Sequence, residues 1–192
     1  MNTHCNAKIV AVISRLASHK GIDLIIEAIP GLIDLGAQVV VLGTGVNTYE
    51  NKLKDLEHRY FNDMRVMLQY NNPLSRKFYS ASDIFVMPSK SEPCGLSQMI
   101  ASRYGSVPIV RATGGLYDTI SDFNYDTLVG NGFTFRDYNS NALYNRIKDA
   151  ILLYKNDKDK FKSLVKNVME KDFSWDASAK VYIETYKNLL KK

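Results

Sequence analysis

The chain of 192 residues is 45% apolar and 23% charged, which is the composition of a globular domain and excludes a disordered one. No apolar run reaches the roughly 18 residues of a membrane helix. The first residues, MNTHCNAKIV, lack the basic and then apolar segments of a signal peptide. We therefore expect a cytoplasmic protein that is long enough to bury a sizeable core.

The formal charge of +5 does not by itself indicate a nucleic-acid-binding protein. The basic residues are dispersed, and the densest run, at 155–160, is interspersed with aspartates. Such a modest excess suits a phosphorylated small molecule as well as it suits a duplex. The cysteines are too few for a disulfide framework and show no metal-ligand spacing with the histidines: Cys5, Cys94, His4, His19 and His58. We expect no metal, no nucleic acid and no membrane as partners.

Short runs of apolar and β-branched residues predict strands at 8–13, 38–42, 65–70, 84–87, 107–110 and 132–135. Helical spacing predicts helices between them: one closing near 36, others at 49–61 and 74–81, and two that begin near 96 and 116. Beyond 139 the chain is predicted to be helical, with a last helix in 170–192. Three apolar stripes there are expected to face the core: Leu143, Ile147, Ile151 and Tyr154; Phe161, Leu164, Val165 and Val168; Ala179, Tyr182, Tyr186 and Leu189.

Strands that alternate with helices predict an α/β fold, a doubly wound parallel sheet of about six strands covered on both faces. In such sheets, ligands bind at the carboxyl ends of the strands. Six residues of interest follow predicted strand ends and should gather along one edge: Arg15, Gly43, Gly45, Tyr70, Glu92 and Thr113.

The segment Ser89–Gln98 joins a predicted strand to a predicted helix and contains a carboxylate, a proline, a thiol and a glycine. Gly95 permits close approach of the backbone to a ligand where the helix begins. Because Glu92 is itself negative, it is better suited to sugar hydroxyl groups or a developing positive charge than to phosphate. The alternative is a capped helix with an exposed glutamate.

Arg15 and Lys20 lie on one strand-to-helix loop, where a guanidinium and an ammonium can together bind a diphosphate. The alternative is an unrelated surface pair. The glycines of Gly43-Thr44-Gly45 are better explained by a plain turn than by a dinucleotide fingerprint. The segment Thr113-Gly114-Gly115 is a second candidate anion cradle. Tyr70 can stack on a purine or simply pack.

Taken together, these stretches resemble the carboxyl-terminal half of bacterial glycogen synthases and plant starch synthases, which are retaining glucosyltransferases of the two-Rossmann-domain (GT-B) architecture. The resemblance covers nearly the whole chain. The matching stretches are Ser14-Arg15-Leu16 with Lys20-Gly21, Glu92 to Gln98, Tyr104-Gly105, Thr113-Gly114-Gly115-Leu116 with Asp118-Thr119, and Phe173-Ser174-Trp175.

The resemblance implies that Arg15, Lys20 and Glu92 carry catalysis on ADP-glucose, without a cofactor. The two cations would hold the diphosphate, and Glu92 would contact the transferred glucose. Donor binding would involve Tyr70 under the adenine, with Cys94, Gly95, Leu96, Ser97, Thr113, Gly114 and Gly115 around the sugar and phosphates. Two departures from the family are Ser91, where an aromatic residue is common, and Ser97, which replaces threonine.

The resemblance also implies that 1–192 is only the nucleotide-sugar-binding domain, without the amino-terminal domain that completes the α-1,4-glucan site. We therefore expect the isolated domain to bind nucleotide but not to catalyse. A plant-type parent would place it in plastids. The alternatives are a GT-B enzyme that uses UDP- or GDP-sugar, and a non-catalytic nucleotide-binding module.

Overall fold

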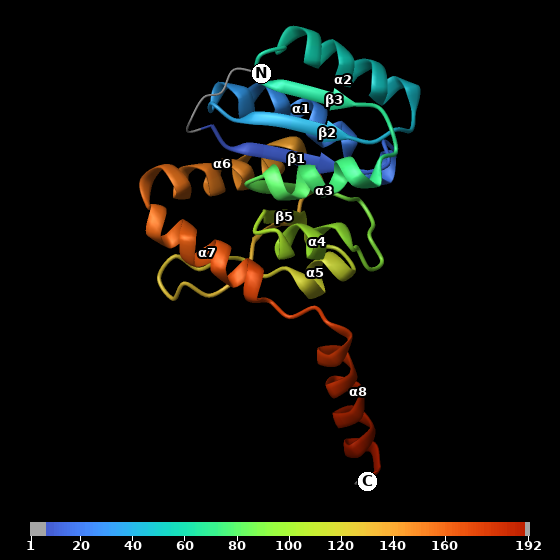
Figure 1. Ribbon diagram of the computed structural model, residues 1–192, viewed down its shortest axis with the longest axis vertical. Helices are drawn as coiled ribbons and strands as arrows, with labels where there is room; N and C mark the ends of the chain where they lie inside the picture. Colours follow the sequence, from blue (N-terminus) through green and yellow to red (C-terminus); the bar gives the residue numbers. More distant parts are fainter. Residues whose placement is uncertain (1–6, 191–192) are drawn as a thin grey trace.

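A computed structural model describes residues 7–190, so His4 and Cys5 lie outside the described residues. Its centre is a parallel sheet in the order β3-β2-β1-β4-β5-β6 (Figure 1). This order confirms the predicted doubly wound sheet. From β1, the strands β2 and β3 are added on one side, and β4, β5 and β6 on the other. Such folds bind ligands at this switch point between β1 and β4. The strands are β1 (Ile9–Ile13), β2 (Gln38–Leu42), β3 (Met64–Met67), β4 (Ile84–Met87), β5 (Val107–Arg111) and β6 (Phe133–Phe135).

Helices alternate with these strands, as the sequence predicts, but the bounds differ at several ends. The strand β3 ends at Met67, so Tyr70 lies in the connection to the next helix. That helix begins at Asn72, two residues earlier than predicted, because the Asn71 side chain caps it by accepting from the Leu74 N–H. The helical elements are η1 (Ser18–Lys20), α1 (Ile22–Asp34), α2 (Asn47–Arg59), α3 (Asn72–Ala81), α4 (Ser97–Arg103), α5 (Gly115–Thr119), α6 (Ser140–Asn156), α7 (Lys158–Glu170) and α8 (Trp175–Leu190).

The two faces of the sheet carry separate apolar cores. The larger core joins one face of the strands to α1, α2, α6 and α7. The smaller core packs α3, α4 and α5 against the other face, around Phe85. Because side chains alternate along a strand, Val10 and Val12 enter the larger core while Ala11 enters the smaller one. The sheet is therefore covered on both faces, and a ligand can reach it at the carboxyl ends of its strands.

The prediction for the carboxyl-terminal helices is correct for α6 and α7 and wrong for α8. Leu143, Ile147, Phe161 and Leu164 are buried, as expected. The last helix buries no residue, and its predicted core stripe is exposed, with Tyr186 at 61%. Figure 1 shows α8 extending away from the sheet. An apolar stripe indicates a buried face only where another element lies against it, and none does so within residues 7–190.

No helix among the described residues is both long and apolar enough to cross a membrane.

Candidate functional site

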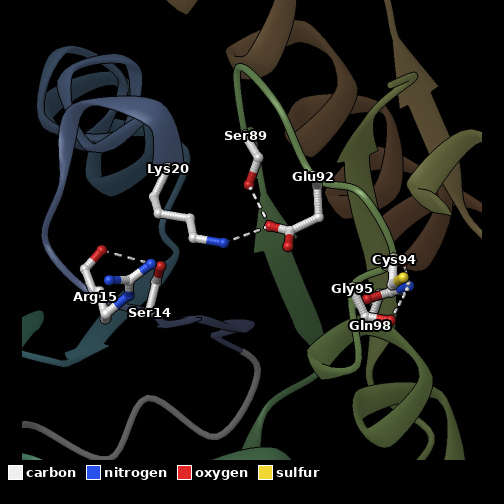
Figure 2. Close-up of polar contacts among 8 residues, drawn as sticks. All are labelled: Ser14, Arg15, Lys20, Ser89, Glu92, Cys94, Gly95 and Gln98. Atoms are coloured by element: carbon white, nitrogen blue, oxygen red, sulfur yellow. Dashed lines mark hydrogen bonds and ion pairs between the residues drawn. The ribbon is translucent and has the colours of Figure 1, made fainter. Parts of the chain in front are cut away.

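Two loops bring opposite charges together at the reversal point of the sheet. Arg15 and Lys20 follow β1, and Glu92 follows β4, its neighbour in the sheet. The Lys20 Nζ lies 2.7 Å from Glu92 Oε2, and Figure 2 shows this side chain reaching across from one loop to the other. Of the two predicted cations, Lys20 therefore meets the predicted acid.

Glu92 is not the exposed glutamate of the alternative interpretation. The residue is only 9% exposed. Its Oε2 accepts a second hydrogen bond from the Ser89 hydroxyl, at 3.1 Å (Figure 2). Burying a carboxylate without partners is costly, and Lys20 and Ser89 supply two hydrogen-bond donors to this one.

A pocket of about 340 Å³, within the size range of small-ligand sites, is lined by Arg15 from the loop after β1 and by Leu96 and Ser97, which follow Glu92 in the chain. Lys20 and Glu92 themselves do not line it. Arg15 is on its wall, and no described residue pairs with the exposed guanidinium. Tyr70, 84% exposed, is another part of the wall. The residues that line the pocket are mostly apolar or neutral: Ile13, Ser14, Arg15, Leu42, Gly43, Thr44, Gln69, Tyr70, Asn71, Asn72, Ser75, Tyr79, Leu96, Ser97 and Ile100.

The turn after β2 lies against the loop after β1. The Leu16 N–H donates to the Thr44 carbonyl at 3.0 Å, and Gly43 and Thr44 reach the pocket. Glu50 stabilises the turn, because its Oε1 accepts from the Thr44 hydroxyl and from the Gly45 N–H. These hydrogen bonds lower the pKa of the Glu50 carboxyl. The segment is a turn, as expected, but it also shapes the pocket.

Ser97 begins α4 beside the phenol of Tyr79. Burial raises the pKa of Tyr79, and a hydrogen bond with Ser97 opposes that rise. Tyr79 is therefore a neutral group on the pocket wall at physiological pH. Ser97 thus begins α4 and lines the pocket, and its contact with a phosphate stays a prediction.

The Glu92 loop, residues 89–97, is held by groups that sequence analysis did not single out. Arg111 donates to the Lys90 carbonyl at 3.0 Å, and the Lys90 N–H donates to the backbone carbonyl of His19 at 2.8 Å. The buried Gln98 amide nitrogen donates to the carbonyls of Cys94 and Gly95 and to the Thr119 hydroxyl. No sequence signal distinguishes these residues from ordinary polar ones, because each acts through backbone groups of a loop that is distant or folded back.

The anion cradle expected at residues 113–115 is wrong in two of its three N–H donors. The Thr113 N–H donates to the Arg111 carbonyl at 2.8 Å. The Gly115 N–H donates to the carbonyls of Glu92 and Pro93, each at 3.1 Å. A Cβ on Gly115 would lie 2.1 Å from the Cys94 carbonyl oxygen, so a glycine is needed for this approach. This segment therefore supports the Glu92 loop, and its contact with a donor stays a prediction.

The predicted site residues thus fall into two neighbouring groups. Arg15, Tyr70, Leu96 and Ser97 line the pocket. The second group consists of Glu92 and the residues in or against its loop: Lys20, Cys94, Gly95, Thr113, Gly114 and Gly115. Cys94 is an exposed free thiol. Residues 7–190 contain no group of three or more His, Cys, Asp or Glu side chains able to hold a metal ion.

A family model for glycosyl transferases group 1 matches residues 3–168. The chain belongs to this family. It is similar to the glycogen synthase of Clostridium beijerinckii, with 48% identity over 184 residues that cover 96% of this chain and 38% of the relative. The glycogen synthase of Kosmotoga olearia is 46% identical over 182 residues, which are 95% of this chain and 38% of that protein. These findings confirm the resemblance seen in the sequence.

Solved structures agree with this assignment to the group 1 glycosyl transferases. The catalytic domain of starch synthase IV from Arabidopsis thaliana, bound to ADP and acarbose, superposes with a TM-score of 0.86 and 40% identity. The match covers 97% of this chain and 39% of that one. A sucrose-phosphate synthase from Thermosynechococcus elongatus, with a TM-score of 0.70 and 24% identity, shares the fold. The chain thus spans 38–39% of the length of the two glycogen synthases and the starch synthase.

Proposed function

We propose that this chain is the donor-binding half of a glycogen or starch synthase. The whole enzyme would transfer glucose from ADP-glucose to the non-reducing end of an α-1,4-glucan with retained configuration. The observation that carries the proposal is the contact of Lys20 with Glu92 across two loops, together with a pocket that Arg15 and Tyr70 line. Relatives at 40–48% identity support the choice of substrate, since one of them binds ADP and acarbose.

In this proposal, the two cations hold the diphosphate and stabilise the charge that develops on the departing ADP. Preorganised charge of this kind commonly supplies the largest part of catalysis. Tyr70 stacks on the adenine, and the Ser97 hydroxyl binds a phosphate oxygen. Glu92 interacts with the glucose, where its charge is complementary to an oxocarbenium-like sugar.

The remaining part of a full-length relative would close the cleft, exclude water and bind the glucan acceptor. We therefore propose that the 192-residue chain binds ADP without transferring glucose, and that the parent enzyme works in the cytoplasm. A separately produced amino-terminal domain should restore transfer if the chain is half of such an enzyme. A non-catalytic nucleotide-binding module would bind ADP and gain no activity from that addition.

The test of the donor is calorimetric titration of the 192-residue protein with ADP, UDP and GDP under the same conditions. We expect ADP to bind at least about tenfold more tightly than UDP, a difference of about 1.4 kcal/mol. Equal or tighter binding of UDP or GDP would instead indicate another sugar nucleotide. Absence of binding to all three would contradict a donor-binding role.

A further inference from the structure

The two oxygens of the Glu92 carboxylate differ in their contacts. Oε2 accepts from the Lys20 ammonium at 2.7 Å and from the Ser89 hydroxyl at 3.1 Å. No described residue donates to Oε1, and Oε1 is not among the buried side-chain atoms that lack a partner. That oxygen is therefore open to solvent, and a ligand group can reach it.

Ser89 differs from Lys20 as a partner of Oε2. It is 2% exposed and lies three residues before Glu92 in the same loop, directly after β4 and Pro88. Its hydroxyl is carried on a short side chain with a single rotatable bond to the oxygen. Lys20 comes from another loop, on a long and flexible side chain whose ammonium can change partners by bond rotation.

A diphosphate at the site competes with Glu92 for Lys20. An ammonium has three donors, and in the proposed function some of them turn to phosphate oxygens. Among the described residues, Ser89 is then the one that still donates to Oε2 while the diphosphate is bound. A hydroxyl also adds no positive charge beside the carboxylate, whereas a second cation would weaken the attraction of Glu92 for a positive sugar.

We propose that Ser89 is a positioning residue that holds Oε2 of Glu92, so that Oε1 faces the transferred sugar when Lys20 binds the diphosphate. The inference rests on the proposed function and extends it to a residue that the resemblance did not assign. It predicts a specific effect: Ser89 matters for binding the glucose part of the donor and not for binding ADP.

The test compares titrations with ADP and with ADP-glucose for the 192-residue protein and its variants. Ser89→Ala should leave the Kd for ADP within about twofold and lower the preference for ADP-glucose by about fivefold to tenfold, within the net contribution of one ordinary hydrogen bond, because Ser89 acts on the sugar only through Glu92. Ser91→Ala is the matched control, because Ser91 is exposed in the same loop and should change neither value.

A double-mutant cycle separates positioning from a general structural role. If Ser89 acts through Glu92, then Ser89→Ala should have no further effect on the preference in a Glu92→Ala background. Additive effects would overturn the proposal, as would an unchanged preference in Ser89→Ala or an equal loss for both ligands. Equal affinity of the wild-type protein for ADP and for ADP-glucose would overturn it as well. Failure to bind ADP at all would contradict the proposed function itself.

Discussion

Arg15 and Lys20 lie on the same loop, but of these two cations only Lys20 forms an ion pair with a described residue. The Arg15 guanidinium is exposed on the pocket wall. Lys20 pairs with a buried carboxylate. The two cations therefore contribute differently to folding, although both are proposed to bind the same diphosphate.

Arg15→Ala should weaken ADP binding by about tenfold to a hundredfold, the effect of one charge-assisted hydrogen-bond partner, and leave the melting temperature unchanged. Lys20→Ala should weaken ADP binding and also lower the free energy of unfolding by about 1–3 kcal/mol, because Glu92 loses its cation. Calorimetry and thermal denaturation measure the two effects. Arg59→Ala, at the exposed end of α2, is the control and should change neither. Wild-type ADP affinity in Arg15→Ala would remove Arg15 from the site.

Tyr70 is 84% exposed in the connection after β3, so its ring contributes little to packing. Tyr70→Ala should weaken ADP binding by about 1–3 kcal/mol, the usual contribution of stacking a base on an aromatic ring. Tyr70→Phe should retain most of the affinity, because it retains the ring. Titration with ADP measures both, and Tyr186→Ala on α8 should match the wild type. Equal losses in the Phe and Ala variants would argue for the hydroxyl instead of stacking.

At the scale of elements, Tyr138 connects the segment after β6 to the first turn of α1. Its hydroxyl donates to Asp23 at 2.8 Å, and Asp23 is in the first turn of α1. Burial raises the pKa of Tyr138, and the hydrogen bond to Asp23 adds to the rise. The same connection lies beside Arg111, which donates to the Arg136 carbonyl and to the Glu92 loop.

This raised pKa predicts a loss of stability in alkali. Between the ordinary tyrosine value of 10.0 and the higher folded value, the native state keeps a proton that the unfolded state loses. The contribution is thus complete below pH 10 and is lost as pH rises above it. Urea denaturation from pH 8 to 11 should show a shallower decline in Tyr138→Phe, with some slope left because burial also raises the pKa of Tyr79 and Tyr125. Tyr186→Phe, exposed on α8, should follow the wild type, and an identical slope in Tyr138→Phe would refute the assignment.

At the scale of the whole molecule, α8 has no buried residue and extends away from the sheet (Figure 1). Isolated helices of this length are only marginally stable in water. Its exposed apolar residues include Tyr182, Tyr186 and Leu189.

Truncation after Ser174 should therefore leave the melting temperature of the domain within about 2 °C of the full chain, since ordered core contacts are untouched. Hydrogen exchange should be fast across 175–190 in the intact chain. Truncation before α7 is the contrasting variant and should unfold the domain, because Phe161, Leu164 and Val168 belong to the larger core. A clear loss of stability on removing α8 alone would mean that it contacts the domain in solution.

Local sequence was sufficient to predict the strands and helices, because their formation depends mainly on residues that are neighbours in the chain. Buried strands appear as runs of β-branched residues, such as 38–42, and their alternation with helices predicts a parallel sheet. Because all carboxyl ends of such a sheet meet at one edge, the approach of Lys20 to Glu92 also follows from the order of elements.

Tertiary structure alone decided which faces are covered and which backbone groups are already bonded. The apolar residues Leu96 and Ile100, at the start and in the middle of the α4 region, are exposed, with Leu96 at 67%. The polar Gln98 is buried instead, and its amide bonds the Glu92 loop. The Gly115 N–H looks available in the sequence but is bonded to Glu92 and Pro93. Periodicity shows that a helix has two faces, and only the position of its neighbours determines which face is buried.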